Sequence, residues 1–131
     1  MKALVARELS GPSGLDYTDV DEVGGDDSVV IDVGAAGVSF PDLLLLRGEY
    51  QLRLEPPFIP GMEVAGVVRS APYESEFKPG QRVTALAMLG GWAEQVAVPG
   101  RRRREPAAGR GGSGVRWKVS SRASRKRSDW R

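Results

Sequence analysis

The chain of 131 residues contains no cysteine and no histidine. Without cysteine it has no disulfide framework and no thiolate metal site. Without histidine it lacks the commonest zinc ligand and the commonest general base of proteins. It has no apolar run of membrane-spanning length, and its first residues become charged too early for a secretory leader. We therefore expect a soluble protein of the cytoplasm.

Most large apolar side chains and most acidic residues lie before residue 100. Leu, Ile, Phe, Met and Tyr do not occur after Leu89. Residues 1–100 carry 7 Lys and Arg against 15 Asp and Glu, a net charge of −8, whereas residues 101–131 carry 12 against 2, a net charge of +10. So few apolar side chains cannot offset the entropy of ordering a segment. The sequence therefore predicts one domain over 1–100 and a disordered tail rich in Arg, Gly and Ser over 101–131.

The first 100 residues alternate short β-type runs with glycine and proline turns. A short helix is expected over 39–48, where Ser39 or Phe40 caps it, Pro41 suits its first turn and Gly48 ends it. Residues 16–27 are interpreted as a polar connection without regular structure, and 49–61 as a proline-rich loop. Strands are expected within 2–6, 28–39, 62–71, 77–88 and 90–99. The pattern favours a mostly β domain with one or two short helices, folded as a small, partly open barrel.

Three blocks of this domain carry a family resemblance. They read "GAAGVSFPDLLLLRGEY" from Gly34, "PPFIPGMEVAGVV" from Pro56, and "KPGQRVTAL" with "GGWAEQVAVP" from Lys78 to Pro99. In this order and spacing they resemble the N-terminal, GroES-like domain of the medium-chain dehydrogenase/reductase family, closest to its zinc-independent quinone oxidoreductase branch. The resemblance implies an NADPH-dependent oxidoreductase that transfers hydride to a quinone or a conjugated enone.

The resemblance also bears on metal binding. Zinc-dependent members bind zinc through a Cys and a His at the positions that are Ser39 and Met62 here. A hydroxyl and a thioether are poor zinc ligands, so we expect no metal. Met62 is then a residue of the core or of the cleft lining, and we expect it to line the substrate site.

By resemblance, further residues face the cofactor and the substrate. Ser39, Phe40 and Asp42 would lie near the nicotinamide, and Trp92 would line the substrate pocket. Tyr50 is the candidate catalytic residue, because its hydroxyl could orient or protonate a carbonyl oxygen. Each has a structural alternative: Asp42 could only support the first turn of its helix, and Phe40 and Trp92 could belong to the core.

Residues 101–131 contain a misleading motif, and their sequence has two possible explanations. Gly109, Gly111 and Gly114 match G-x-G-x-x-G, but no apolar strand precedes them and no helix is expected after them, so we reject a dinucleotide site. The tail could be a basic segment that binds nucleic acid non-specifically, attached to a non-enzymatic β scaffold. It could also be a frameshifted sequence, which is the explanation we favour, because a run of Arg codons read one base later encodes Val, Ala, Asp or Gly.

In either case the Rossmann domain that follows in this family is missing from these residues. We therefore expect the chain alone to be an inactive fragment that does not hold NADPH tightly. In the intact family the protein is a dimer that acts on a small carbonyl or quinone substrate.

Overall fold

A computed structural model describes residues 1–100 and 119–120. The chain forms two antiparallel sheets, and neither closes on itself. The elements in chain order are β1 (Lys2–Ala6), a 3-10 helix η1 (Gly11–Gly14), β2 (Leu15–Asp19), β3 (Ser28–Ala36), α1 (Phe40–Leu46), β4 (Glu63–Ser70), β5 (Arg82–Leu86), β6 (Gln95–Pro99) and β7 (Val119–Ser120). This confirms the predicted mostly β architecture with one short helix and a second helical turn.

The larger sheet has the strand order β6-β3-β4-β5-β7. Its central strand β3 pairs with β4 on one side and with β6 on the other, and the pairing with β4 is interrupted between Val30 and Ile31 and again between Val33 and Ala35. The core lies on this sheet and buries ten apolar side chains: Val29, Ile31, Val64, Val68, Phe77, Val83, Ala85, Ala87, Val96 and Val98. These side chains come from β3 to β6 and their flanking loops, which explains why the alternating runs of the sequence predicted these strands.

The smaller sheet consists of β1 and β2, paired from Lys2↔Asp19 to Ala6↔Leu15. The expectation of an irregular connection over 16–27 was therefore wrong for residues 16–19. The residues of β2 are partly buried or exposed, so the stretch carries little of the hydrophobic signal by which a strand is recognised. Backbone pairing with β1, rather than burial, makes it a strand.

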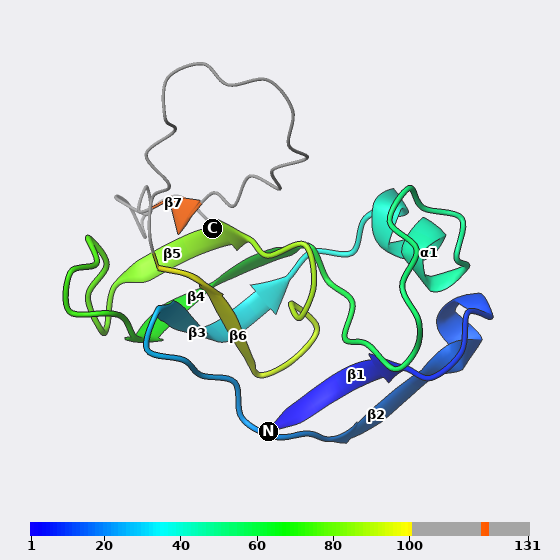
Figure 1. The fold of residues 1–131 in the computed structure, drawn as a ribbon, viewed down its shortest axis with the longest axis horizontal. Coiled ribbons are helices and arrows are strands. Elements are labelled where there is room, and N and C mark those ends of the chain that lie inside the picture. The colour runs from blue at the N-terminus through cyan, green and yellow to red at the C-terminus, as the bar shows by residue number, and fades with distance from the viewer. Residues whose placement is uncertain (101–118, 121–131) are drawn as a thin grey trace, which may run out of the picture.

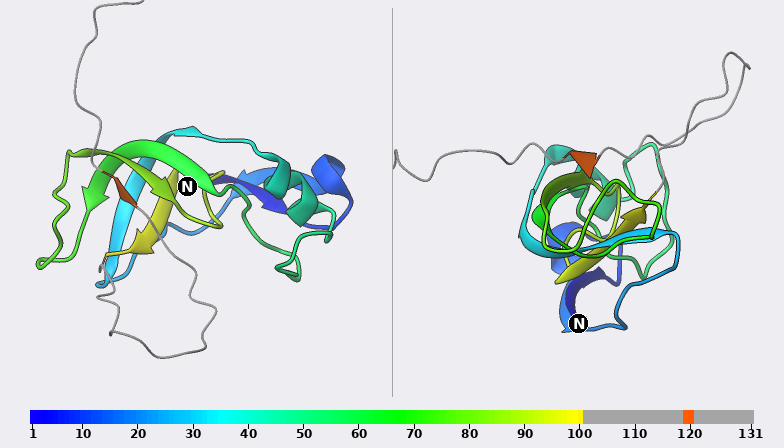
Figure 2. Two further views of the ribbon diagram at one scale, coloured as in Figure 1. Left: turned by 90° about the horizontal axis from the view of Figure 1, so that it is seen from above. Right: turned by 90° about the vertical axis from the view of Figure 1, so that its left-hand side faces the viewer.

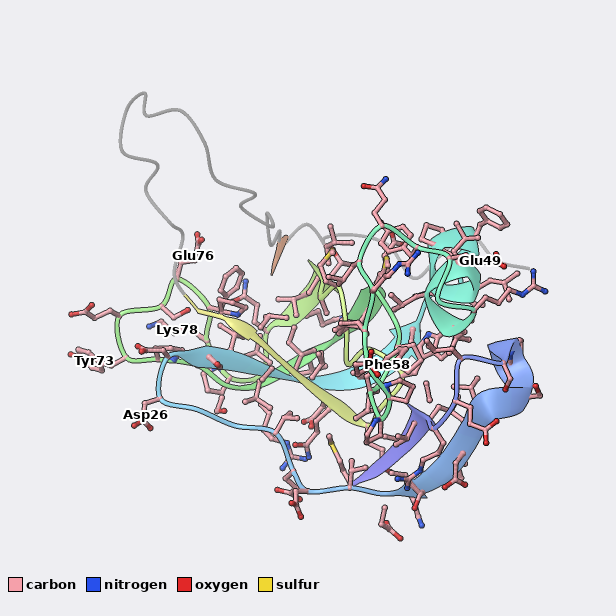
Figure 3. The ribbon with its side chains drawn as sticks, turned by 45° about the vertical axis from the view of Figure 1, so that its right-hand side comes forward. Asp26, Glu49, Phe58, Tyr73, Glu76 and Lys78 are labelled. Atoms are coloured by element: carbon pink, nitrogen blue, oxygen red, sulfur yellow. The ribbon has the colours of Figure 1, made fainter. Side chains whose placement is uncertain are left out.

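The β4–β5 turn and the helix α1 lie at opposite ends of the described chain. Figure 1 and Figure 2 show the turn between β4 and β5 at one end, and α1 and η1 together at the other. Tyr73, in the β4–β5 loop, is 97% exposed and points into solvent (Figure 3). Phe58 lies beside β1 and exchanges two backbone hydrogen bonds with Ala6, which fixes the loop after α1 onto the small sheet.

The predictions for the tail fall largely outside the described residues. Within 101–131, the structure describes only Val119–Ser120, which pair with β5 at Ala85 and Thr84. No helix among the described residues is long and apolar enough to cross a membrane.

Candidate active site

The entrance to α1 brings two of the predicted residues into direct contact. Ser39 has an extended backbone and precedes the helix, and Pro41 stands within its first two positions, where its fixed φ is favourable. Both the backbone N–H and the Oγ–H of Ser39 donate to Oδ2 of Asp42, at 2.8 and 2.7 Å. A carboxylate at this position also interacts favourably with the exposed N–H groups of the first turn.

Asp42 is almost completely enclosed. Its side chain is 1% exposed, and its second oxygen, Oδ1, has no hydrogen-bond partner among the described residues. The structural alternative considered for Asp42, support of the helix start, is therefore present in the fold. Asp42 can affect a ligand through Ser39, whose half-buried hydroxyl oxygen takes part in the capping box with the N–H of Asp42 and can accept one further hydrogen bond.

Phe40 begins α1, and Tyr50 follows its end. Phe40 is the first residue of the helix and is 70% exposed, so it is not a core residue of the described chain. Tyr50 follows the end of the helix and is partly buried. No hydrogen bond joins Tyr50 to the other predicted site residues within the described chain.

Trp92 joins three segments that are far apart in sequence. Its indole Nε1–H donates to the carbonyl oxygen of Gly37 at 2.9 Å. Its backbone N–H donates to Pro60 at 3.0 Å, and its carbonyl oxygen accepts from the N–H of Leu4 at 2.8 Å. Its ring lies so close to Gly61 that a Cβ there would overlap the indole Cδ1, which explains the glycine and its φ of +100°. Trp92 thus connects the loop before α1, the segment before β4, and β1.

Met62 follows this junction and is 7% exposed. Its carbonyl oxygen accepts from the N–H of Ala87, so it is fixed between β4 and the end of β5. The hydroxyl of Ser39 is committed to Asp42, and the thioether of Met62 is buried. The described residues contain no group of three or more His, Cys, Asp or Glu that could hold a metal ion.

An open groove of about 650 Å³ lies beside Trp92. Its walls come from β1, β2, the second half of β3, the loop before α1 and the start of the segment leading to β6. The residues are Lys2, Ala3, Leu4, Leu15, Tyr17, Val33, Gly34, Ala35, Ala36, Val38, Gly91, Trp92, Ala93 and Glu94. Of the predicted site residues only Trp92 is among them. Val38, which is 82% exposed, reaches the groove from the same loop as Ser39.

Charge at this groove is confined to Lys2 and Glu94. Nζ of Lys2 donates to Oδ2 of Asp19 at 2.6 Å, and the backbone N–H of Lys2 donates to Oε2 of Glu94 at 2.8 Å. The hydrogen bond between the side chains raises the pKa of Lys2 and lowers the pKa of Asp19. Both groups are therefore charged near neutral pH and form an exposed ion pair.

Sequence reasoning missed Gly37 and Gly91 as parts of this site. Gly37 accepts from the Trp92 indole and donates its own N–H to the carbonyl oxygen of Glu63 at 2.8 Å. Gly91 permits a close approach, because a Cβ there would lie 2.7 Å from the carbonyl oxygen of Gly61. The sequence does show two glycine-containing turns, "PGM" and "GGW". It does not show that these two turns contact each other, because they are far apart in the chain.

Several solved structures with similar folds are those of oxidoreductases. A probable oxidoreductase from Mycobacterium abscessus superimposes with a TM-score of 0.74 at 62% identity, over 76% of this chain and 32% of that one. The quinone oxidoreductase of Thermus thermophilus, whose complex with NADPH is known, superimposes with a TM-score of 0.63 at 46% identity, over 76% of this chain and 30% of that one.

Curated relatives agree with these structures. Quinone oxidoreductase-like protein 2 of Rattus norvegicus is 37% identical over 95 residues, which are 72% of this chain and 27% of the relative. The chain thus spans about a quarter to a third of the length of these three proteins. Its residues 25–108 match the Alcohol dehydrogenase GroES-like domain, which confirms the predicted resemblance. The chain therefore belongs to the family of alcohol dehydrogenase GroES-like domains, and its relatives within that family include quinone oxidoreductases.

Proposed function

We propose that residues 1–100 form the substrate-side domain of a zinc-independent, NADPH-dependent oxidoreductase that reduces quinones or conjugated enones. The observation that carries the proposal is that the three family blocks meet at Trp92. Trp92 belongs to the third block and contacts Gly37 of the first and Gly61 of the second, so it holds the loop of Ser39 and the segment of Met62 against one another. The similarity to a quinone oxidoreductase with a known NADPH complex supports the cofactor. NADPH, when bound, supplies the hydride.

The residues around α1 would then bind the nicotinamide end and the substrate. The proton of Ser39 Oγ is donated to Asp42, so the hydroxyl can only accept a hydrogen bond, for instance from an amide N–H of the ligand. The exposed ring of Phe40 offers an apolar surface to a flat ring. Tyr50 would donate its phenol proton to a carbonyl oxygen of the substrate.

The described residues do not fit the phosphates of the cofactor. Their only α-helix has seven residues, and the carboxylate of Asp42 already occupies its first turn, so a phosphate there would meet a negative charge. The described part of the chain also has a strong excess of acidic side chains. We therefore propose that these 131 residues do not bind NADPH tightly or reduce quinones by themselves.

Zinc does not fit the site either. The two side chains at the zinc-ligand positions are a serine whose hydroxyl is committed to Asp42 and a buried thioether, and neither is a good ligand for Zn²⁺. A cytoplasmic location and a small carbonyl or quinone substrate are parts of the same proposal.

The test is a chimera that supplies the rest of the enzyme. Residues 1–100 of this chain would replace the matching part of the Thermus thermophilus quinone oxidoreductase, and NADPH oxidation would be followed with quinones and enones. We expect quinone-dependent turnover that survives treatment with a strong chelator. We expect Tyr50→Phe to lower kcat by about tenfold or more, as loss of a positioned proton donor does.

The control is Tyr73→Phe, which removes the same hydroxyl from the exposed β4–β5 loop and should leave turnover unchanged. A folded chimera that binds NADPH but reduces none of these acceptors would refute the proposed activity. Turnover abolished by the chelator would refute zinc independence. Micromolar, saturable NADPH binding by the unsubstituted 131-residue chain would refute the claim that it does not bind alone.

A further inference from the structure

We propose that Trp92 is a positioning residue. Its indole N–H fixes the loop of Ser39, residues 37–39 between β3 and α1, relative to the segment of Met62, residues 59–62 before β4. The inference rests on the proposed function in one respect, because it takes Ser39 and Met62 as residues of the site. The hydrogen bonds and close contacts that carry it belong to the described chain and do not depend on any ligand.

The first step concerns the loop that Trp92 holds. Between the end of β3 and α1, Gly37 is bound from two sides: its N–H donates to Glu63 at 2.8 Å, and its carbonyl oxygen accepts from Nε1 of Trp92 at 2.9 Å. Val38, the next residue, is 82% exposed and provides almost no burial to order this stretch. The two hydrogen bonds at Gly37 therefore determine where Ser39 enters the helix.

The second step concerns how Trp92 itself is held. The backbone N–H groups of Gly90, Gly91 and Trp92 donate to the carbonyl oxygens of Ile59, Gly61 and Pro60, at 2.8, 3.0 and 3.0 Å. These three bonds attach the segment of Trp92 to the segment that leads into Met62.

The side chain of Trp92 packs closely against the backbone of Gly61. A Cβ at Gly61 would overlap the indole, and a Cβ at Gly91 would lie 2.8 Å from Cγ1 of Val64. The indole therefore packs against Gly61 on one side, and its N–H is bound to Gly37 in the loop before Ser39 on the other. A side chain with the same bulk but without an N–H would keep the packing against Gly61 and lose the hydrogen bond to Gly37.

The experiment compares amide hydrogen exchange in the full 131-residue chain and its variant Trp92→Phe. The N–H groups of Gly37 and Ser39 are hydrogen-bonded, to Glu63 and Asp42, so their exchange reports opening of this loop. We expect Trp92→Phe to accelerate exchange at both by about fivefold or more, which is the loss expected for one hydrogen bond. The N–H groups of Val33 and Val68, which lie within the large sheet, should keep their rates.

The matched control is Tyr17→Phe, which removes a hydroxyl from another aromatic wall of the same groove. It should leave exchange at Gly37 and Ser39 unchanged. If Trp92→Phe lowers the melting temperature by more than about 5 °C, benzothienylalanine at position 92 replaces it, because this side chain keeps the bicyclic shape and lacks the N–H.

The outcomes separate this inference from the proposed function. Faster exchange confined to the loop supports the positioning role. Unchanged exchange at Gly37 and Ser39 overturns it, and so does acceleration that is equal throughout the sheet, which would indicate a packing residue only. A folded chimera that binds NADPH but is inactive would refute the proposed function and would leave the exchange result at Gly37 and Ser39 standing.

Discussion

Single glycines decide how closely the strands of this domain approach one another. Gly66 lies on β4, and a Cβ at this position would overlap the backbone carbonyl oxygen of Asp32 and reach within 2.8 Å of Cγ2 of Ile31. A backbone atom cannot move aside as a flexible side chain can. Because β3 is paired on both sides, relief would have to come from separating β3 and β4.

We therefore expect Gly66→Ala to lower the free energy of unfolding by about 3 kcal/mol, near the upper end for overpacking. Gly24→Ala is the matched control, since nothing lies within 4 Å of a Cβ there, and it should change stability by less than about 0.5 kcal/mol. Urea unfolding followed by circular dichroism measures both. Equal stabilities for the two variants would mean that β3 and β4 are not as close as described.

Ser39 is a second single residue with a structural role, because its hydrogen bonds stabilise the start of α1. Its Oγ–H and N–H are the two hydrogen-bond donors to the buried carboxylate of Asp42. Ser39→Ala removes one of them and should cost about 1 kcal/mol in urea unfolding. Ser39→Thr keeps the hydroxyl and should restore most of the loss.

Ser13→Ala controls for the loss of any serine hydroxyl, because Ser13 is exposed and donates only to neighbouring Ser10. It should change stability by less than about 0.5 kcal/mol. A loss at Ser39→Ala no larger than that at Ser13→Ala would contradict the role of this hydroxyl at the start of α1.

At the scale of elements, local sequence predicted what depends on local chemistry. The strands of the core were predictable because β-branched residues alternate there, and α1 was predictable because Ser39, Pro41 and Gly48 mark its start and its end. β2 was not predictable, because its backbone pairs with β1 while its side chains remain largely in solvent. The contact of Trp92 with Gly37 spans 55 residues, and no local pattern encodes it.

The small sheet offers a pH test of its own pairing. Lys2 and Asp19 are opposite each other in the β1–β2 register, and their hydrogen bond lowers the pKa of Asp19 below its ordinary value of 3.8. A carboxyl group whose pKa is lowered by folding stabilises the fold above its unfolded pKa and loses that effect as the pH falls through its folded pKa.

We therefore expect Asp19→Asn to be less stable than the unsubstituted chain near neutral pH, with a difference that shrinks as the pH falls below 3.8. Thermal melts from about pH 6 to about pH 2 measure it. Because both side chains are solvent-exposed, about 1 M NaCl should reduce the difference at neutral pH. A difference that is the same at every pH would show that the ion pair does not titrate with folding.

For the whole molecule, the separation of charge along the chain limits which of the two sequence hypotheses can hold. Residues 1–100 carry a net charge of −8 and repel nucleic acid, whereas residues 101–131 carry +10. Any affinity for a polyanion must then come from the last 31 residues. The family model matches residues 25–108 and gives no role to the rest of the basic segment.

We expect the chain to bind single-stranded DNA only non-specifically, with an affinity set by the number of Lys and Arg side chains that contact phosphates. The direct comparison is with a 131-residue variant in which residues 101–131 are scrambled at constant composition. Fluorescence anisotropy at several salt concentrations should give the two chains the same affinity within about threefold and the same steep decrease with salt. If the natural order binds about tenfold tighter than the scrambled one, the order of the arginines and of Trp117 and Trp130 matters. The basic segment would then be a selected binding element, and the description of this chain as part of an oxidoreductase alone would be insufficient.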